Sequence, residues 1–141
     1  MVILRTGMVL GADGGALAKL HFPFSIGLGG KTGSGKQPVS FIHITDLVEA
    51  ILFAIENQAI RGIVNAVTPY PVTNAEFTGT LAKVLGQTSW LSIPEFALRM
   101  IYGEGAQVLL NGQKVLPEIL ERYGFRFKYP TILNALVQIY G

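Results

Sequence analysis

The chain has 141 residues, half of them hydrophobic and only 14% charged, against roughly 25% charged residues in an average soluble protein. Its length suits one domain with a sizeable core, and no stretch approaches the roughly 20 apolar residues that cross a bilayer. The absence of cysteine excludes disulfides, a thiol nucleophile and cysteine–zinc sites.

The 11 basic and 9 acidic residues are scattered, without the basic run typical of nucleic-acid binding. His21 and His43 are too far apart in sequence to suggest a metal site. We therefore expect no nucleic-acid partner, no metal and no membrane span. Because no secretory signal is visible at the N-terminus, we expect a cytoplasmic protein.

Three β-branched runs in the first half predict strands, at about residues 2–5, 41–44 and 63–67. The first of them is expected to be buried. Residues 11–38, between the first two runs, hold eight glycines and little periodicity. They are predicted to form one long loop.

Two helices are predicted to follow the second and third strands. The first covers about 46–57, with Asp46 as its N-cap. The second starts at a capping box of Thr73 and Glu76, and Gly86 closes it. The order strand–helix–strand–helix predicts parallel pairing and a mixed α/β class.

The second half changes character, because prolines and glycines divide it into short segments. We predict helices at about 94–102, 104–111, 117–123 and 130–140, with a short edge strand at 125–127. The whole chain is expected to be a single domain. In it, residues 1–88 form strands with their helices, and residues 89–141 form a helical C-terminal subdomain.

Residues 30–36 imitate a phosphate-binding P-loop, G-x-x-x-x-G-K. The motif fails at the next position, where Gln37 replaces the hydroxyl that ligates Mg²⁺. It also fails in context, because Pro38 and a β-rich run follow where a helix should begin. We interpret the segment as a mildly basic, Gly-rich loop, which can still lie over an anionic ligand. A true P-loop would bind ATP with Mg²⁺ and lose it on Lys36→Ala.

A series of motifs then runs through nearly all of the chain. In order they are R-T-G at 5–7, G-S-G at 33–35, S-F-I-H at 40–43, Asp46, V-N at 64–65, P-V-T-N-x-E-F at 71–77, G-E at 103–104, L-L at 109–110, G-Q at 112–113 and G-F at 124–125. Together they resemble a subgroup of epimerase-like proteins in the extended short-chain dehydrogenase/reductase superfamily. Such proteins are commonly labelled NAD(P)-dependent or nucleoside-diphosphate-sugar epimerases, and sometimes cell-division inhibitors.

The resemblance implies the C-terminal part of a Rossmann-like fold, with a few parallel strands and a helical substrate-side subdomain. The nucleotide-binding G-x-x-G-x-x-G of that family, expected in an N-terminal unit, is absent from this sequence. The catalytic Tyr-x-x-x-Lys of the family is absent too, so we expect no catalytic residue here.

The resemblance also implies which residues bind ligands. The strand end and the backbone after it are expected to meet the nicotinamide of NAD(P), at Arg5, Thr6, Gly7, Met8 and Val9. The alternative is that Arg5 pairs with a carboxylate and Gly7 only makes a turn.

Substrate contacts are expected from Lys31, Lys36, Gln37 and Arg99, and the alternative for the first three is a solvated loop. Val39 stands where sugar-nucleotide epimerases carry an arginine for the diphosphate, which weakens the sugar-nucleotide interpretation.

Other polar residues are interpreted structurally. His43 is expected to be a hydrogen-bonded core histidine, and Asn65 a turn or cap group.

Two functional hypotheses remain. In the first, the chain is the substrate-side portion of an NAD(P)-dependent epimerase or reductase acting on a sugar nucleotide or another carbonyl compound, inactive without a separate Rossmann half. In the second, it is a non-catalytic interaction module that self-associates or regulates another protein through exposed apolar surface.

Overall fold

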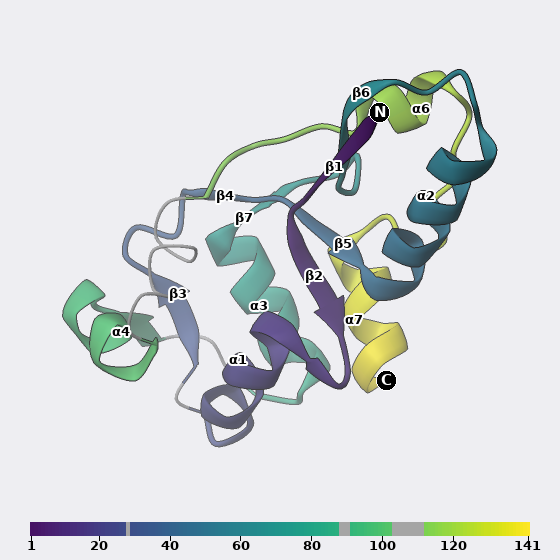
Figure 1. Cartoon of the computed structure of the whole chain (residues 1–141). Coiled ribbons are helices and arrows are strands. Elements are labelled where there is room, and N and C mark those ends of the chain that lie inside the picture. The colour runs from purple at the N-terminus through teal and green to yellow at the C-terminus, as the bar shows by residue number, and fades with distance from the viewer. Residues whose placement is uncertain (28, 88–90, 103–111) are drawn as a thin grey trace.

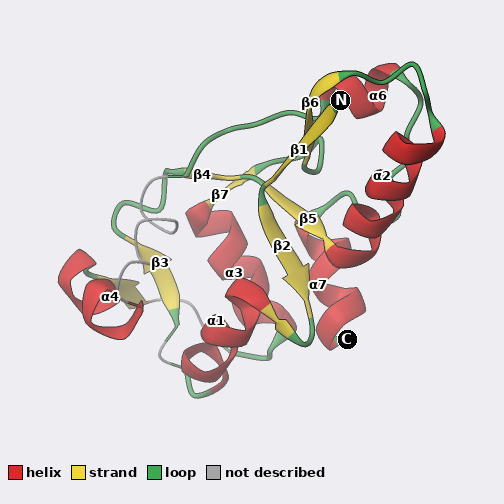
Figure 2. Ribbon diagram, in the orientation of Figure 1, coloured by secondary structure: helices red, strands yellow, loops and turns green. Residues whose placement is uncertain are grey.

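The computed structural model describes residues 1–27, 29–87, 91–102 and 112–141 (Figures 1 and 2). The predicted helix at 104–111 lies outside these ranges. In chain order the elements are β1 (Val2–Thr6), β2 (Met8–Gly11), α1 (Gly15–Ser25), β3 (Gly30–Thr32), β4 (Pro38–Val39), β5 (Phe41–His43), α2 (Ile44–Glu56), β6 (Gly62–Ala66), β7 (Val72–Thr73), α3 (Asn74–Val84), β8 (Leu91–Ile93), α4 (Glu95–Tyr102), α6 (Glu118–Arg122) and α7 (Ile132–Tyr140).

In the described ranges the strands pair in four ladders of two, three of them parallel, and the pairing of β1 with β6 confirms the predicted parallel arrangement. β3 and β8 were not predicted as strands. β1 pairs with β6 and β2 with β5, while β3 pairs with β8. The fourth ladder, β4 with β7, is antiparallel.

β1 and β2 form one extended segment that changes its neighbour at Gly7. Before Gly7 it pairs with β6, and after Gly7 it pairs with β5 (Figure 1). The N–H of Thr68, just past β6, donates to the carbonyl of Phe41 at 2.7 Å. β5 therefore lies between β2 and the residues that follow β6. We call the divergence of β2 from these residues at Gly7 the fork.

Two apolar cores lie on this framework. One gathers side chains from α1, β2, β4, β5, α3 and α7, namely Leu10, Leu17, Leu20, Phe24, Val39, Phe41, Phe77, Leu81, Ala82, Ile132, Ala135 and Leu136. The other joins α2, β6 and α6 through Ala50, Ile60, Val64 and Leu120. The C-terminal helices thus complete both cores, since α7 packs on α3 and α6 packs on β6.

The expectation of one long loop over residues 11–38 is wrong, because α1 occupies its first half. The helix has Pro23 inside it and no side-chain cap at Gly14, so the usual start and stop signals are missing. It is held by tertiary burial instead: Leu17 and Phe24 are at most 1% exposed. Lys36 is followed by a short strand and not by a helix, as the β-rich run after Pro38 predicted.

The helices after β5 and β7 are confirmed, with one change of cap. In α3 the hydroxyl of Thr73 accepts from the N–H of Glu76 at 3.2 Å, and Gly86 (φ 72°) closes the helix, as predicted. In α2, however, the N-cap is His43 and not Asp46. The helix starts two residues earlier than predicted because the His43 ring accepts from the N–H of Thr45.

Two further expectations are wrong. Residues 125–127 form no strand, and the ring of Phe125 packs edge-on against those of Phe53 and Phe127. The first strand is not buried on both faces, since Ile3 is 45% exposed and its cross-strand partner Ile63 is 47% exposed.

Large apolar side chains also face solvent along α2. Val48, Leu52 and Ile55 are 50%, 51% and 71% exposed. No helix within the described ranges has both the length and the apolar character to span a membrane.

Candidate functional site

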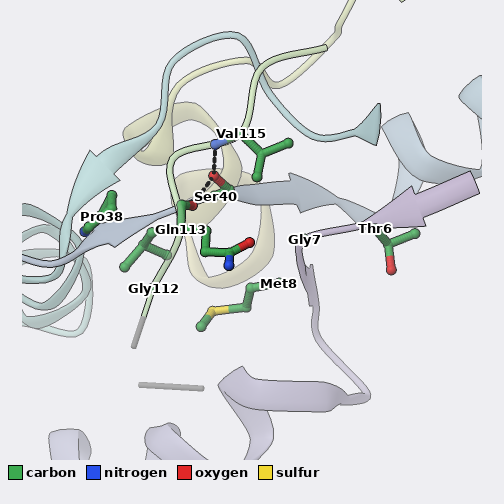
Figure 3. A pocket seen from close by; sticks show the side chains of 9 residues that line it. Thr6, Gly7, Met8, Pro38, Ser40, Gly112, Gln113 and Val115 are labelled. Carbon is green, nitrogen blue, oxygen red and sulfur yellow. Dashed lines mark hydrogen bonds between the residues drawn. The ribbon is translucent and has the colours of Figure 1, made fainter. Parts of the chain in front are cut away.

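The fork at Gly7 opens two adjoining hollows at the carboxyl ends of β1 and β6. The first, of about 370 Å³, is lined by Thr6, Gly7, Met8, Pro38, Val39, Ser40, Gly112, Gln113 and Val115 (Figure 3). The second, of about 480 Å³, is lined by Arg5, Thr6, Gly7, Asn65, Val67, Gln113 and Val115. The two share four residues, so they form one crevice that passes over the fork. Ligands of open α/β sheets bind at this edge of the strands.

The backbone of the fork is closely packed, which explains the glycine at its apex. A Cβ on Gly7 would lie 2.5 Å from the carbonyl oxygen of Ser40 and 2.9 Å from Cγ1 of Val67. The N–H of the next residue, Met8, donates to the same Ser40 oxygen at 2.9 Å. A side chain at position 7 would therefore push β2 away from β5.

A C-terminal segment crosses the fork and is held there by one hydroxyl. Ser40 Oγ donates to the carbonyl of Gln113 at 2.7 Å and accepts from the N–H of Val115 at 2.9 Å (Figure 3). Gly112 lies directly on the Pro38 carbonyl, with no room for a side chain. Residues 112–115 are thus fixed over the β4–β5 link.

The two hollows differ in charge. No charged residue lines the first hollow within the described part of the chain. The second is lined by the cationic residue Arg5, whose partner in the parallel register is Asn65. Arg5 makes no ion pair with any residue that the structure describes. The crevice therefore has an uncharged end and a cationic end.

The structure brings four of the five expected cofactor residues together at this crevice, Arg5, Thr6, Gly7 and Met8. The N–H of Met8 is occupied by Ser40, so it is not available to a ligand. Val9 faces a third hollow of about 400 Å³, which it shares with Ile44 and the turn before α1.

The residues expected to contact substrate are not among those that line these hollows. Lys31 and Lys36 are exposed, on β3 and in the turn that follows it. Gln37 is used internally, since its amide donates to the carbonyl and hydroxyl oxygens of Thr32 at 3.0 and 2.9 Å. Arg99 is exposed on α4, beside β3 in Figure 1.

His43 and Asp46 have structural roles. His43 is 2% exposed, and its Nε2 lies 2.6 Å from Oε1 of Gln138, so the prediction of a hydrogen-bonded core histidine is confirmed. Asp46 is completely buried and accepts from the backbone N–H groups of Lys128 and Tyr129.

Among the residues that the structure describes, two groups have shifted pKa values, and both lie outside the crevice. The Lys128 ammonium lies 2.6 Å from Glu49, and that hydrogen bond raises its pKa above 10.5. Burial raises the pKa of the Tyr140 phenol above its ordinary 10.0.

Three residues of the crevice were missed as site residues. Ser40 and Gln113 were noted as motif positions without a role, and Asn65 was interpreted as a turn or cap group. Asn65 lies inside β6, and its amide donates to the Leu116 carbonyl at 3.4 Å. The pairing of residue 40 with 113 spans 73 positions, and no local pattern reports a contact at that separation.

The parallel strands, their helices and the crevice at the strand ends define a mixed α/β fold of the Rossmann-like class. Its likeness to known epimerases is specific. The chain is 38% identical to the human epimerase family protein SDR39U1 in a crystal structure with NADPH, with a TM-score of 0.92 over 99% of this chain and 48% of that one. It is 33% identical to a nucleoside-diphosphate sugar epimerase from Corynebacterium glutamicum, with a TM-score of 0.76 over 99% of this chain and 26% of that one.

Sequence relatives agree. The chain is 46% identical over 136 residues to an epimerase family protein SDR39U1 homolog of Arabidopsis thaliana, described as chloroplastic. That alignment covers 96% of this chain and 39% of the Arabidopsis protein. Residues 93–139 match a domain of unknown function, DUF1731. The chain is thus homologous to epimerase family proteins and spans less than half of the length of these relatives.

Proposed function

We propose that this chain is the substrate-side portion of an NAD(P)-dependent epimerase or reductase, inactive until a Rossmann half completes it. The observation that carries the proposal is the uncharged hollow at the carboxyl end of β1, beside the cationic end formed by Arg5. An uncharged hollow lined by apolar side chains, with the hydroxyl of Thr6 and the amide of Gln113 among them, fits the nicotinamide ring and its carboxamide, and Arg5 offers charge complementarity to an anionic group of the ligand.

The residues of the crevice support a binding role and leave the chemistry to other groups. NAD(P), when bound, supplies hydride transfer, which also needs a proton donor or acceptor beside it. The titratable side chain that lines these two hollows, in the described part of the chain, is that of Arg5. Because a guanidinium stays protonated, it can orient an anion but cannot exchange protons.

The similar human protein, crystallised with NADPH, makes that cofactor the first probe. We would titrate the chain with NADPH and NADH and follow nicotinamide fluorescence. Saturable binding with Kd below about 1 mM, or roughly 4 kcal/mol, is expected. Gly7→Ala, which forces β2 away from β5, should remove it, whereas Gly14→Ala, with no atom within 4 Å of the new Cβ, should not. A folded chain that shows no saturation contradicts the proposal.

The substrate of the protein and its cellular location are also proposals. The neighbour from C. glutamicum is named for nucleoside-diphosphate sugars, and the cationic end at Arg5 suits a phosphate. Val39, however, stands where sugar-nucleotide epimerases carry an arginine for the diphosphate. It is 8% exposed and offers no charge to a diphosphate, so another carbonyl compound remains an alternative. A cytoplasmic location stays a prediction, since the Arabidopsis homologue is described as chloroplastic.

A second candidate function rests on the exposed apolar surface of α2. Val48, Leu52 and Ile55 are each at least half exposed, and such side chains in a row mark contact surfaces. We propose, as the alternative, a non-catalytic module that self-associates or binds another protein through this face. A regulatory role of the cell-division-inhibitor type belongs to this alternative. Concentration-dependent association without nucleotide binding would favour it.

A further inference from the structure

The side chain of Gln113 occupies the junction of the two hollows. It lines both, and in Figure 3 its amide points into the space beside Gly7 and Met8. It is exposed, and it makes no hydrogen bond to any residue that the structure describes. A carboxamide offers two donors and an acceptor, so this group brings hydrogen-bonding capacity into the crevice that no residue of the described ranges uses.

The backbone that carries Gln113 is held unusually well for a segment without secondary structure. Ser40 Oγ fixes the Gln113 carbonyl and the Val115 N–H, and Gly112 rests on the Pro38 carbonyl. A side chain on a fixed backbone loses less conformational freedom when it binds a ligand, so more of its hydrogen-bond energy appears as affinity. The hydrogen bonds of Ser40 thus stabilise the fold and also position Gln113 in the crevice.

The chemistry of the first hollow restricts what Gln113 can recognise. The described lining carries no charge there, and its other side-chain polar groups are the hydroxyls of Thr6 and Ser40, of which Ser40 is already committed to the backbone. An ion would lie in this end without a counter-charge, whereas an uncharged group with both a donor and an acceptor would match the amide. Such groups are the carboxamide of a nicotinamide and the hydroxyl of a sugar.

We propose that Gln113 is a ligand-contacting residue of the crevice, which hydrogen-bonds an uncharged donor–acceptor group, and that Ser40 is its positioning residue. The inference rests on the proposed function, because it assumes that the crevice binds a ligand. It adds a recognition residue from the C-terminal part of the chain, 106 positions after Gly7 in the sequence.

The test is an NMR titration of the whole ¹⁵N-labelled chain with NADPH and, separately, with UDP-glucose. Two signals are followed, the side-chain amide of Gln113, identified by its loss in Gln113→Leu, and the backbone amide of Gly7. We expect both to shift with one Kd in at least one titration. A shift with NADPH assigns a group of the cofactor as the one recognised, and a shift with UDP-glucose alone assigns a group of the sugar nucleotide.

Variants separate recognition from folding. Gln113→Leu should raise Kd about three- to tenfold, as expected for one neutral hydrogen bond, while the spectrum stays dispersed. Gln58→Leu, an exposed glutamine after α2, is the matched control and should leave Kd unchanged. Ser40→Ala should raise Kd and move the free-state signal of the Gln113 amide, and Ser40→Thr, which keeps the hydroxyl, should restore both.

Two results would overturn the inference, and they differ in what they leave standing. If Gly7 shifts while the Gln113 amide does not, or if Gln113→Leu leaves Kd unchanged, the crevice binds its ligand without Gln113 and the proposed function survives. If no signal at the fork moves with either probe in a folded chain, the proposed function fails and this inference fails with it.

Discussion

The buried carboxylate of Asp46 accepts the backbone N–H of Tyr129 at 3.0 Å, which joins the first turn of α2 to the segment that leads into α7. Its other oxygen accepts the N–H of Lys128 at 2.8 Å. Because Asp46 is completely buried, solvent does not reach the two N–H groups that its carboxylate accepts from. Two elements more than 80 positions apart in the sequence are thus tied by one side chain.

We therefore predict that Asp46→Ala lowers the free energy of unfolding by about 2–4 kcal/mol, since two donors lose a charged acceptor. Asp46→Asn, which keeps one carbonyl oxygen, should cost less. Urea unfolding followed by circular dichroism measures both. Asp13→Ala, at an exposed position, is the control and should change stability by no more than about 0.5 kcal/mol. An equal effect of the two alanine variants would contradict this role of Asp46.

A second prediction concerns the apex of the fork. Gly7→Ala places a Cβ 2.5 Å from a backbone oxygen that cannot turn away, and overpacking of this kind costs about 1–3 kcal/mol. At Gly14 the same change meets nothing within 4 Å. Thermal unfolding of the two variants should therefore separate them clearly, with Gly14→Ala close to the parent chain. Equal melting temperatures of the Gly7→Ala and Gly14→Ala variants would show that β2 can move away from β5 without loss of stability.

His43 should be coupled energetically to Gln138. Nδ1 accepts from Thr45, so Nε2 carries the proton and donates to the Gln138 oxygen 2.6 Å away. We predict that His43→Ala costs about 1–2 kcal/mol as a lost helix cap, and that a double-mutant cycle with Gln138→Ala gives a coupling of about 0.5–1.5 kcal/mol. Additive effects in urea unfolding would mean that the contact carries no energy.

Alkaline pH should destabilise the protein through Tyr140. Burial raises the pKa of this phenol, so the unfolded chain releases the proton at about pH 10 and the folded chain only at higher pH. The folded state binds more protons in that window, and stability must fall as the pH rises through it. Tyr140→Phe keeps the ring that stacks on His21 and should make the fall shallower. Urea midpoints at pH 8 and above pH 10 check this, and parallel curves for the two proteins would exclude Tyr140.

The elements that the sequence predicted are those with signals at both ends. α3 is an example, because the hydroxyl of Thr73 and the left-handed Gly86 mark its limits locally. α1 was missed because its start is an uncapped glycine and Pro23 lies within it. The spacing of Leu17, Leu20 and Phe24 was the available signal, and its meaning depends on a core contributed by distant segments.

The candidate site divides in the same way. The strand end at Arg5–Gly7 was recognisable, since a short apolar run stops at a glycine there. The crossing of residues 112–115 over Ser40 was not, because it depends on where the C-terminal segment returns. Gln37 shows the reverse case: a polar residue next to Lys36 suggested a ligand contact, and the fold uses its amide to hold Thr32.

The apolar face of α2 allows the last prediction, which distinguishes the two candidate functions. Leu52 and Ile55 lie in the helix that the sequence predicted over about 46–57, yet these side chains are 51% and 71% exposed. Charging them in Leu52→Lys/Ile55→Lys should leave the free energy of unfolding within about 0.5 kcal/mol per site, because little buried surface is lost. If the face binds a second copy of the chain, the double variant should be monomeric in sedimentation at concentrations where the parent chain associates.

The matched control charges an equal number of exposed apolar residues on another helix. Leu133 and Val137 of α7 are 54% and 47% exposed, and Leu133→Lys/Val137→Lys should leave any association intact. Loss of association in both double variants would point to a general effect of charge and not to α2. A parent chain that stays monomeric at high concentration and still binds NADPH would remove the self-associating module and leave the incomplete enzyme as the function of this chain.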